Sequence, residues 1–267
     1  MMRVLDLFSG IGGFSLGLER AGMETVAFCE IEPFCRRVLA KHWPGVPIYE
    51  DVRELTADRL VSDGVGPIDV ICGGFPCQDI STAGMGVGLS GERSGLWREF
   101  RRLIEEIRPR FAVIENVSRL RSKGLEDILG GISSIGYDAE WHCVPASAVG
   151  ARHRQDRVWV LAYTPDEIRR KNPRRMDGCQ EACGRETQVG PVWERLWSAG
   201  HDGPAQGCEN FREPRGWGVE PSVGRVVDGF PGIVDRGAAL GNAVVPQIPE
   251  MIGRAIMGTQ FPERIAS

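Results

Sequence analysis

The sequence lacks long hydrophobic runs, and this absence limits where the protein can work. No apolar stretch in its 267 residues approaches the roughly 18–20 residues that a membrane span needs. The first residues also lack a signal-peptide pattern, because Asp6 interrupts the early apolar stretch. We therefore expect a cytoplasmic protein that makes no membrane contact. With 42% hydrophobic and 25% charged residues, the composition excludes disordered, collagen-like and coiled-coil classes.

The sequence also lacks an excess of positive charge. It has 32 lysine and arginine residues against 36 aspartate and glutamate residues, a net charge of −4, which alone argues against a nucleic-acid partner. The positive charges are nevertheless clustered and are almost all arginine. Residues 93–123 include nine basic and four acidic side chains, and a second cluster lies at 169–175. Arginine suits phosphates and base edges, although solvated arginine faces are the alternative reading.

The eight cysteines lack the spacing of a disulfide framework. Cys29 and Cys72 lie in apolar runs, so we expect them to be small buried side chains. Cys179, Cys183 and Cys208 with His201 form an alternative zinc set, but only one pair is close and its spacing is loose. We therefore predict no metal site.

The first 162 residues alternate between short apolar runs and helical patterns. Expected strands lie at 4–8, 25–29, 48–50, 68–72, 111–114 and 158–162, and expected helices at 14–21, 33–42, 96–108 and 249–257. This alternation predicts an α/β fold with a doubly wound, mostly parallel sheet. Residues 163–223 break the pattern and read as a small loop-rich insert. The main domain is then 1–162 together with 224–267.

Chemically notable residues follow the expected strands. They are the glycine turn 10–13, Glu30, Asp51, the segment 73–77 and Glu115. Ligands of open α/β sheets bind at the carboxyl ends of strands, so these residues indicate one shared site. The turn is not a clean G-x-G-x-x-G, which disfavours NAD. S-adenosylmethionine fits as well, with Glu30 twenty residues after Gly10 as the ribose partner.

Cys77 stands in a Gly-Gly-Phe-Pro-Cys-Gln loop. A cysteine on such a loop is more exposed than one in a strand, and nearby backbone N–H groups lower its pKa. Used as a nucleophile, it needs a partner acid or base, for which Glu115 is a candidate. A structural cysteine is the alternative.

Taken together, five motifs in order resemble the DNA (cytosine-5) methyltransferases of bacterial and phage type over nearly the whole chain. They are Asp6–Phe14 (cofactor loop), Gly74–Gln78 (catalytic loop), Glu115–Val117 (acidic motif), Gly150–Arg157 (arginine motif) and Gly241–Gln247 (C-terminal motif).

The resemblance implies methyl transfer from S-adenosylmethionine to C5 of cytosine in duplex DNA, with the target base flipped out of the helix. In this reading Cys77 adds to C6 of the base. Glu115 holds N3 and the 4-amino group, and Arg157 orients the base and supports developing charge.

The resemblance also assigns binding roles by position. The cofactor residues it implies are Phe8, Gly10, Gly12, Glu30, Ile31, Asp51, Val52, Pro76, Leu96, Asn242 and Val244. The DNA-binding residues it implies are Gln78, Ser81, Arg93, Arg154, Arg169, Arg170, Lys171, Arg174 and Arg175. The insert 163–223 takes the place of the target-recognition domain, and the glycine-rich loop after Cys77 is expected to close over the flipped base.

One departure keeps alternatives open. The family pattern Gln-x-Arg-x-Arg aligns with residues 153–157, where Gln155 replaces the middle arginine. An RNA (tRNA) cytosine-5 methyltransferase with the same pocket is one alternative, and a catalytically weak DNA-binding protein is another. The expected partner is double-stranded DNA, with a cognate restriction endonuclease in the same system. We expect the chain to be a monomer.

Overall fold

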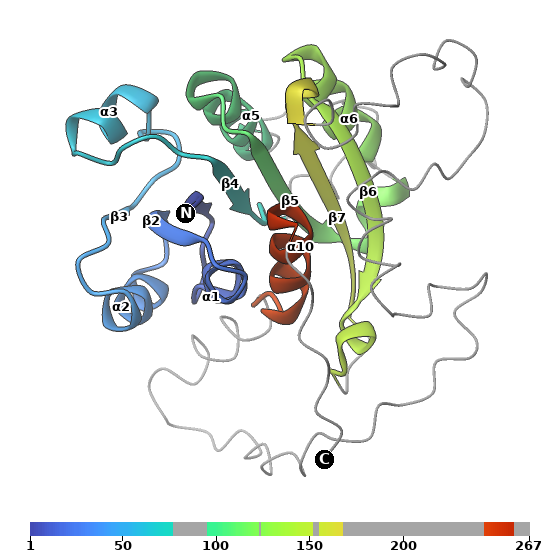
Figure 1. The fold of residues 1–267 in the computed structure, drawn as a ribbon, viewed down its shortest axis with the longest axis horizontal. Helices are drawn as coiled ribbons and strands as arrows, with labels where there is room; N and C mark the ends of the chain where they lie inside the picture. Colours follow the sequence, from blue (N-terminus) through green and yellow to red (C-terminus); the bar gives the residue numbers. More distant parts are fainter. Residues whose placement is uncertain (77–94, 123, 152–154, 168–242, 259–267) are drawn as a thin grey trace.

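The computed structural model describes residues 1–76, 95–122, 124–151, 155–167 and 243–258 (Figure 1). Within them, seven strands form one sheet in the order β3-β2-β1-β4-β5-β7-β6. The strands are β1 Arg3–Leu7, β2 Glu24–Cys29, β3 Ile48–Tyr49, β4 Val70–Gly73, β5 Phe111–Val117, β6 Asp138–Pro145 and β7 Asp156–Tyr163. The helices are α1 Gly13–Arg20, α2 Pro33–His42, α3 Ala57–Ser62, α5 Gly95–Ile107, α6 Leu125–Ser134 and α10 Gln247–Met257, with two 3-10 turns, η3 Ser118–Ser122 and η4 Ala146–Val149.

The sheet is mostly parallel, which confirms the predicted fold class. β1 pairs in parallel with β2 and β4, β2 with β3, and β4 with β5. Only β7 runs against its neighbours, between β5 and β6. Helices cover both faces, as in a doubly wound sheet.

Two hydrophobic clusters fill the space between the sheet and its helices. α3, α5 and α6 pack on one face, and buried residues such as Phe100 and Leu103 of α5 lie there. α1 and α10 pack side by side on the other face, against Trp159 of β7 (Figure 1). The apolar residues that recur at helical spacing in 96–108 therefore form a buried stripe on α5, as predicted. Cys29 and Cys72 are buried as expected, and burial raises the pKa of Cys29 to about 12.

Most predicted elements are present with ends shifted by one to three residues, but three elements went unpredicted. These are α3, α6 and the edge strand β6. One prediction was wrong in detail: Glu115, Asn116 and Val117 do not follow a strand but lie inside β5. The strand continues because β7 pairs with it along its whole length, up to Val117 opposite Arg157.

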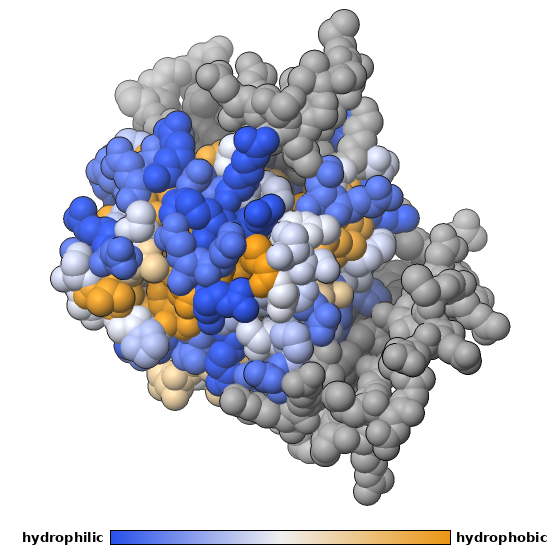
Figure 2. Space-filling model, turned by 90° about the horizontal axis from the view of Figure 1, so that it is seen from above, coloured by the Kyte–Doolittle hydropathy of each residue, from blue (hydrophilic) through white to orange (hydrophobic). Residues whose placement is uncertain are grey.

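One face of the molecule is mainly polar. On the face that Figure 2 shows, hydrophilic side chains cover most of the coloured surface, with hydrophobic ones in smaller areas among them. Among the helices that the structure describes, none combines the length and apolar character needed to cross a membrane.

Candidate active site

The parallel strands bring the predicted site residues to one edge of the sheet. The last residue of β1, Leu7, is paired with Cys29 of β2 and with Gly73 of β4. Cys29 is in turn paired with Tyr49 of β3, and Gly73 with Ile114 of β5. The turns that follow these strands must therefore lie next to one another. The structure therefore places the ends of these strands at one edge of the sheet, as the sequence predicts.

The turn after β1 has an uncommon backbone conformation. Phe8, Gly10 and Gly12 all have positive φ values, of 53°, 54° and 86°. A side chain at Gly10 meets no atom within 4 Å, so the turn is open there. A side chain at Gly12 instead meets the Trp43 ring at 2.5 Å, so glycine is required for helix packing. Gly12 ends the turn as the N-cap of α1.

Glu30 holds the glycine turn against the end of β2. Its Oε2 accepts a hydrogen bond from the Gly10 N–H at 2.6 Å, and its Oε1 accepts one from the Glu32 N–H at 2.8 Å. The residue is 7% exposed. A carboxylate has about four acceptor positions, so two remain for hydroxyl donors. The neighbouring Ile31 is 58% exposed, which leaves an apolar side chain at the same edge.

Asp51 follows β3, and its side chain is 20% exposed. Both carboxylate oxygens accept hydrogen bonds from the Arg53 guanidinium, and Oδ1 also accepts from the Arg53 N–H. These bonds hold the pKa of Asp51 below its usual value. The next residue, Val52, is buried against the core.

Glu115 and Arg157 form an ion pair across β5 and β7. The Arg157 Nε lies 2.7 Å from Glu115 Oε1, and the Glu115 side chain is 11% exposed. Burial raises the pKa of Glu115 to about 7, although Arg157 opposes that rise. The carboxyl group is thus balanced between protonated and ionised forms near neutral pH. The predicted pairing of these two residues in one site is observed.

The segment that leads to Cys77 is fastened to the same strand. The Asn116 side chain donates a hydrogen bond from Nδ2 to the Phe75 carbonyl at 3.0 Å, and Asn116 is 2% exposed. At Gly74 a side chain would meet Glu115 Oε2 at 2.5 Å, so any larger residue there would displace the Glu115 carboxylate from its present place. The sequence places Asn116 in the acidic motif but gives it no role, because its partner is a backbone atom 41 residues away.

The remaining predicted cofactor residues reach the edge from three other segments. Leu96 lies in the first turn of α5. Farther along the same helix the Phe100 ring stacks on the Phe8 ring, with 6.3 Å between the ring centroids. Pro76 is exposed beyond β4. Val244 precedes α10, and its carbonyl is so close to Gly13 that a side chain there would meet it at 2.5 Å. The described part of the C-terminal motif therefore lies against the glycine turn.

A buried carboxyl group that sequence reasoning did not single out lies beneath the glycine turn. Asp6 is fully buried on β1, and its Oδ2 accepts a hydrogen bond from the Ser15 hydroxyl at 2.7 Å. Burial raises the pKa of Asp6 to about 8. The group is therefore largely neutral at pH 7, and it supports the base of the turn.

Several predicted residues lie outside the described part of the chain. They are Cys77, Gln78, Ser81, Arg93, Arg154, Arg169, Arg170, Lys171, Arg174, Arg175 and Asn242. The glycine-rich loop after Cys77, residues 179–208 with the alternative zinc set, and most of the insert are outside it as well. The described residues themselves hold no cluster of three or more potential metal ligands. Gln155 is described, and it lines a small cavity with Glu115 and Arg157.

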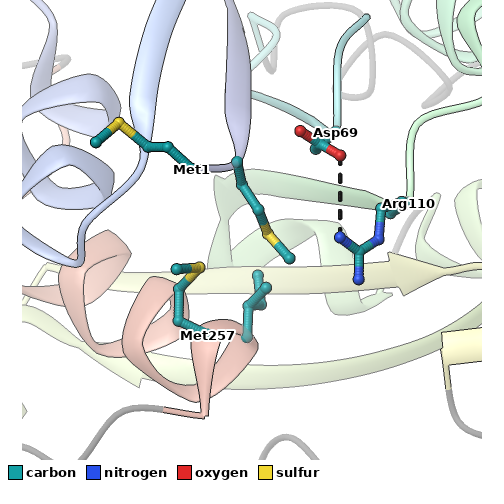
Figure 3. Close-up of a pocket in the computed structure, with 6 residues that line it drawn as sticks. Met1, Asp69, Arg110 and Met257 are labelled. Carbon is teal, nitrogen blue, oxygen red and sulfur yellow. Dashed lines mark ion pairs between the residues drawn. The ribbon is translucent and has the colours of Figure 1, made fainter. Parts of the chain in front are cut away.

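A larger cavity, of about 310 Å³, lies at the opposite edge, where β1 and β4 begin (Figure 3). Figure 3 shows Asp69 and Arg110 facing each other beside Met1 and Met257, and their ion pair measures 3.9 Å. None of the predicted site residues lines this cavity. It is therefore separate from the edge at which the candidate residues gather.

Comparison with known proteins decides the family. The family model described as C-5 cytosine-specific DNA methylase matches residues 2–189, which is more than half of the chain. The chain belongs to this family. The resemblance to the DNA (cytosine-5) methyltransferases is thereby confirmed. The match includes the glycine turn, Glu30, Glu115 and Arg157, and it ends before the C-terminal motif.

Individual relatives of this C5 methylase agree. The Type II methyltransferase M2.BsuMI of Bacillus subtilis is 40% identical over 169 residues, which cover 60% of this chain and 42% of the relative. M.AquIA of a Picosynechococcus strain is 31% identical over 175 residues, covering 60% of this chain and 71% of the relative. The Dnmt2 methyltransferase structure of S. pombe shares the fold at a TM-score of 0.52 and 19% identity, covering 72% of this chain and 59% of that one.

The C5 methylase chain spans less than half the length of the first relatives that it matches, at 42%, 45% and 48% of their residues. The range that the family model matches, residues 2–189, contains all the strands of the described sheet. What those longer proteins do as a whole therefore bears on this chain only as a proposal.

Proposed function

We propose that this chain transfers a methyl group from S-adenosylmethionine to C5 of cytosine in duplex DNA. The observation that carries the proposal is the Glu115–Arg157 pair, 2.7 Å apart, beside the fixed segment that leads to Cys77. A buried carboxyl with a raised pKa next to a guanidinium matches the donor and acceptor pattern of a cytosine edge. Family membership supports the same chemistry.

The residues at the edge fit the cofactor. The open, positive-φ turn at Gly10 leaves space where a ligand needs close approach to the backbone. Glu30 retains acceptor capacity for the two ribose hydroxyls, and Asp51 is the acceptor for the adenine amino group. Ile31, more than half exposed, offers an apolar surface for the adenine ring. When bound there, S-adenosylmethionine supplies an electrophilic methyl group on its sulfonium.

The chain's own residues then activate the base. Cytosine C5 is a poor nucleophile, so the Cys77 thiolate adds to C6 and forms a C–S bond, which makes C5 enamine-like. Protonated Glu115 donates to N3 and accepts from the 4-amino group, which stabilises the charge that this addition pushes onto the ring. Arg157 keeps Glu115 in place and faces the base. After methylation C5 loses its proton to a base, water being one, and the C–S bond breaks to release Cys77.

The substrate reaches these groups by leaving the double helix. C6 of a stacked cytosine is inaccessible, so the target must be flipped into the edge between β4 and β5. We propose that residues 163–223 form the recognition insert on a main domain of 1–162 and 224–267. The basic cluster at 169–175 then supplies affinity for phosphates without reading sequence. A monomer, bound to duplex DNA and paired genetically with a restriction endonuclease, completes the proposal.

Labelled methyl transfer tests the reaction. The full chain is incubated with S-adenosylmethionine carrying a labelled methyl group and with either unmethylated duplex DNA or tRNA. The nucleosides are then separated. We expect label in 5-methyldeoxycytidine from DNA. Label in tRNA alone would contradict the DNA assignment and favour the RNA alternative.

A cysteine variant tests the nucleophile. Cys77→Ser should abolish methyl transfer while DNA binding persists, because a serine hydroxyl is not ionised at neutral pH. Cys143→Ser, on β6, is the control and should keep activity. Methyl transfer that survives in Cys77→Ser would refute the covalent mechanism.

A further inference from the structure

Two arginines hold the turns that form the adenosine half of the proposed cofactor site. The first turn follows β2 and carries Glu30 and Ile31, and the second follows β3 and carries Asp51 and Val52. Both turns contain backbone carbonyl groups that lie outside the paired strands. Such carbonyl groups need hydrogen-bond donors, and a ligand site needs its turns held in one geometry.

Arg36 of α2 holds the first turn. Its Nη1 donates to the Ile31 carbonyl at 2.7 Å and to the Glu30 carbonyl at 3.2 Å. Its Nη2 lies 3.1 Å from the carboxylate of Glu50, the residue before Asp51. The Arg36 side chain is 22% exposed, so it is partly shielded from competing water. One guanidinium therefore joins both walls of the adenosine half.

Arg102 of α5 holds the second turn. Its Nη2 donates to the Val52 carbonyl at 3.0 Å and to the Leu55 carbonyl at 2.8 Å. Two carboxylates on the same helix fix the direction of this fork: Glu99 lies 2.7 Å from Nε and Glu106 lies 2.8 Å from Nη1. α5 also begins next to Leu96, so Arg102 sets the distance between two parts of the same pocket.

We propose that Arg36 and Arg102 are positioning residues that preorganise the adenosine half of the site. The inference rests on the proposed cofactor site, and neither arginine is assigned contact with the cofactor. Both act through carbonyls of the wall residues. A lysine keeps the charge, but its three N–H donors sit on one compact ammonium group, which cannot reproduce the spacing of a guanidinium whose separate nitrogens reach carbonyls and a carboxylate. Arginine-to-lysine changes therefore separate geometry from charge.

The consequence is a split between affinity and turnover. Loosened walls must be ordered when the cofactor binds, which weakens binding but leaves the bound complex unchanged. We expect Arg36→Lys and Arg102→Lys each to raise the KM for S-adenosylmethionine and the Kd for S-adenosylhomocysteine about 10-fold, since each loses one or two hydrogen bonds. The kcat at saturating cofactor should stay within about twofold of wild type, because Glu115 and Arg157 are untouched.

The experiment is calorimetric titration of the full chain with S-adenosylhomocysteine, with steady-state kinetics beside it. Arg37→Lys is the matched control, since Arg37 follows Arg36 on α2, is exposed and lies over the Phe34 ring at 5.8 Å. The inference would be overturned if the wild-type chain binds S-adenosylhomocysteine and both lysine variants bind it with the same Kd. A fall in kcat with unchanged KM would overturn it as well. Failure of the wild type to bind S-adenosylhomocysteine would instead overturn the proposed function.

Discussion

The buried carboxyl of Asp6 predicts an unusual dependence of stability on pH. Asp6 is fully buried, and burial raises its pKa from 3.8 to about 8. The folded chain therefore holds a proton that the unfolded chain releases above about pH 4. Because the unfolded state binds fewer protons in this range, raising the pH lowers the free energy of unfolding. Stability contributed by this group is complete below pH 4 and is lost as the pH rises through 8.

The size of this effect follows from the two pKa values. Proton linkage gives a loss of about 4 kcal/mol from Asp6 between about pH 5 and pH 8. Glu115, with a pKa raised from 4.5 to about 7, shifts stability in the same direction by about 2 to 3 kcal/mol over that range. Asp6→Asn removes the larger contribution and keeps an oxygen that can accept from Ser15.

Urea denaturation at several pH values between 5 and 8 measures this. Asp6 and Glu115 together should lower the wild-type free energy of unfolding by about 6 kcal/mol across the range, whereas Glu115 alone should lower that of Asp6→Asn by only about 2 to 3. The partly buried His142, whose pKa is lowered, opposes both falls equally. Asp58→Asn, an equal change of charge on exposed α3, is the control and should follow wild type. If Asp6→Asn keeps the full wild-type fall, Asp6 is ionised in the folded chain and the argument from burial is wrong.

Three further changes test other contacts. Gly17→Ala should lower the free energy of unfolding by about 1–3 kcal/mol in urea titrations, because its side chain would meet Pro249 Cβ at 2.8 Å between α1 and α10; unchanged stability would show that this helix packing adapts. Gly74→Ala should reduce kcat at least about 10-fold in methyl-transfer assays, since it displaces the Glu115 carboxylate, and full activity would contradict that placement. Glu115→Gln should lower kcat/KM for DNA about 100-fold or more with unchanged cofactor binding, and wild-type kinetics would remove Glu115 from the mechanism.

The sequence was most informative where chemistry and periodicity coincide. Alternating apolar runs and helical stripes predicted the sheet, and the rule that ligands bind at strand carboxyl ends placed Glu30 and Glu115 at one edge. The edge strand β6 was not predicted, although residues 139–143 alternate between apolar and polar side chains as a half-buried strand does. α6 was missed because two consecutive glycines weaken its helical signal.

The contacts that position the site were not predictable from sequence. Arg36, Arg102 and Asn116 act by donating hydrogen bonds to backbone carbonyls. Any residue has such a carbonyl, so the partner leaves no trace in the sequence, and for Arg102 the partner is about fifty residues away. The raised pKa of Asp6 has the same origin, since burial on β1 depends on the whole sheet. The motifs thus named the candidate reacting groups, and the fold revealed the contacts that hold the described ones among them.

Bisulfite sequencing of DNA from cells that express the chain tests the central claim most directly. It reports cytosines that carry a C5 methyl group together with their surrounding sequence. We predict protected cytosines within a defined sequence context, absent from cells that express Cys77→Ser at the same level. Protection no greater with wild type than with Cys77→Ser, from a chain that binds S-adenosylhomocysteine in vitro, would contradict the account.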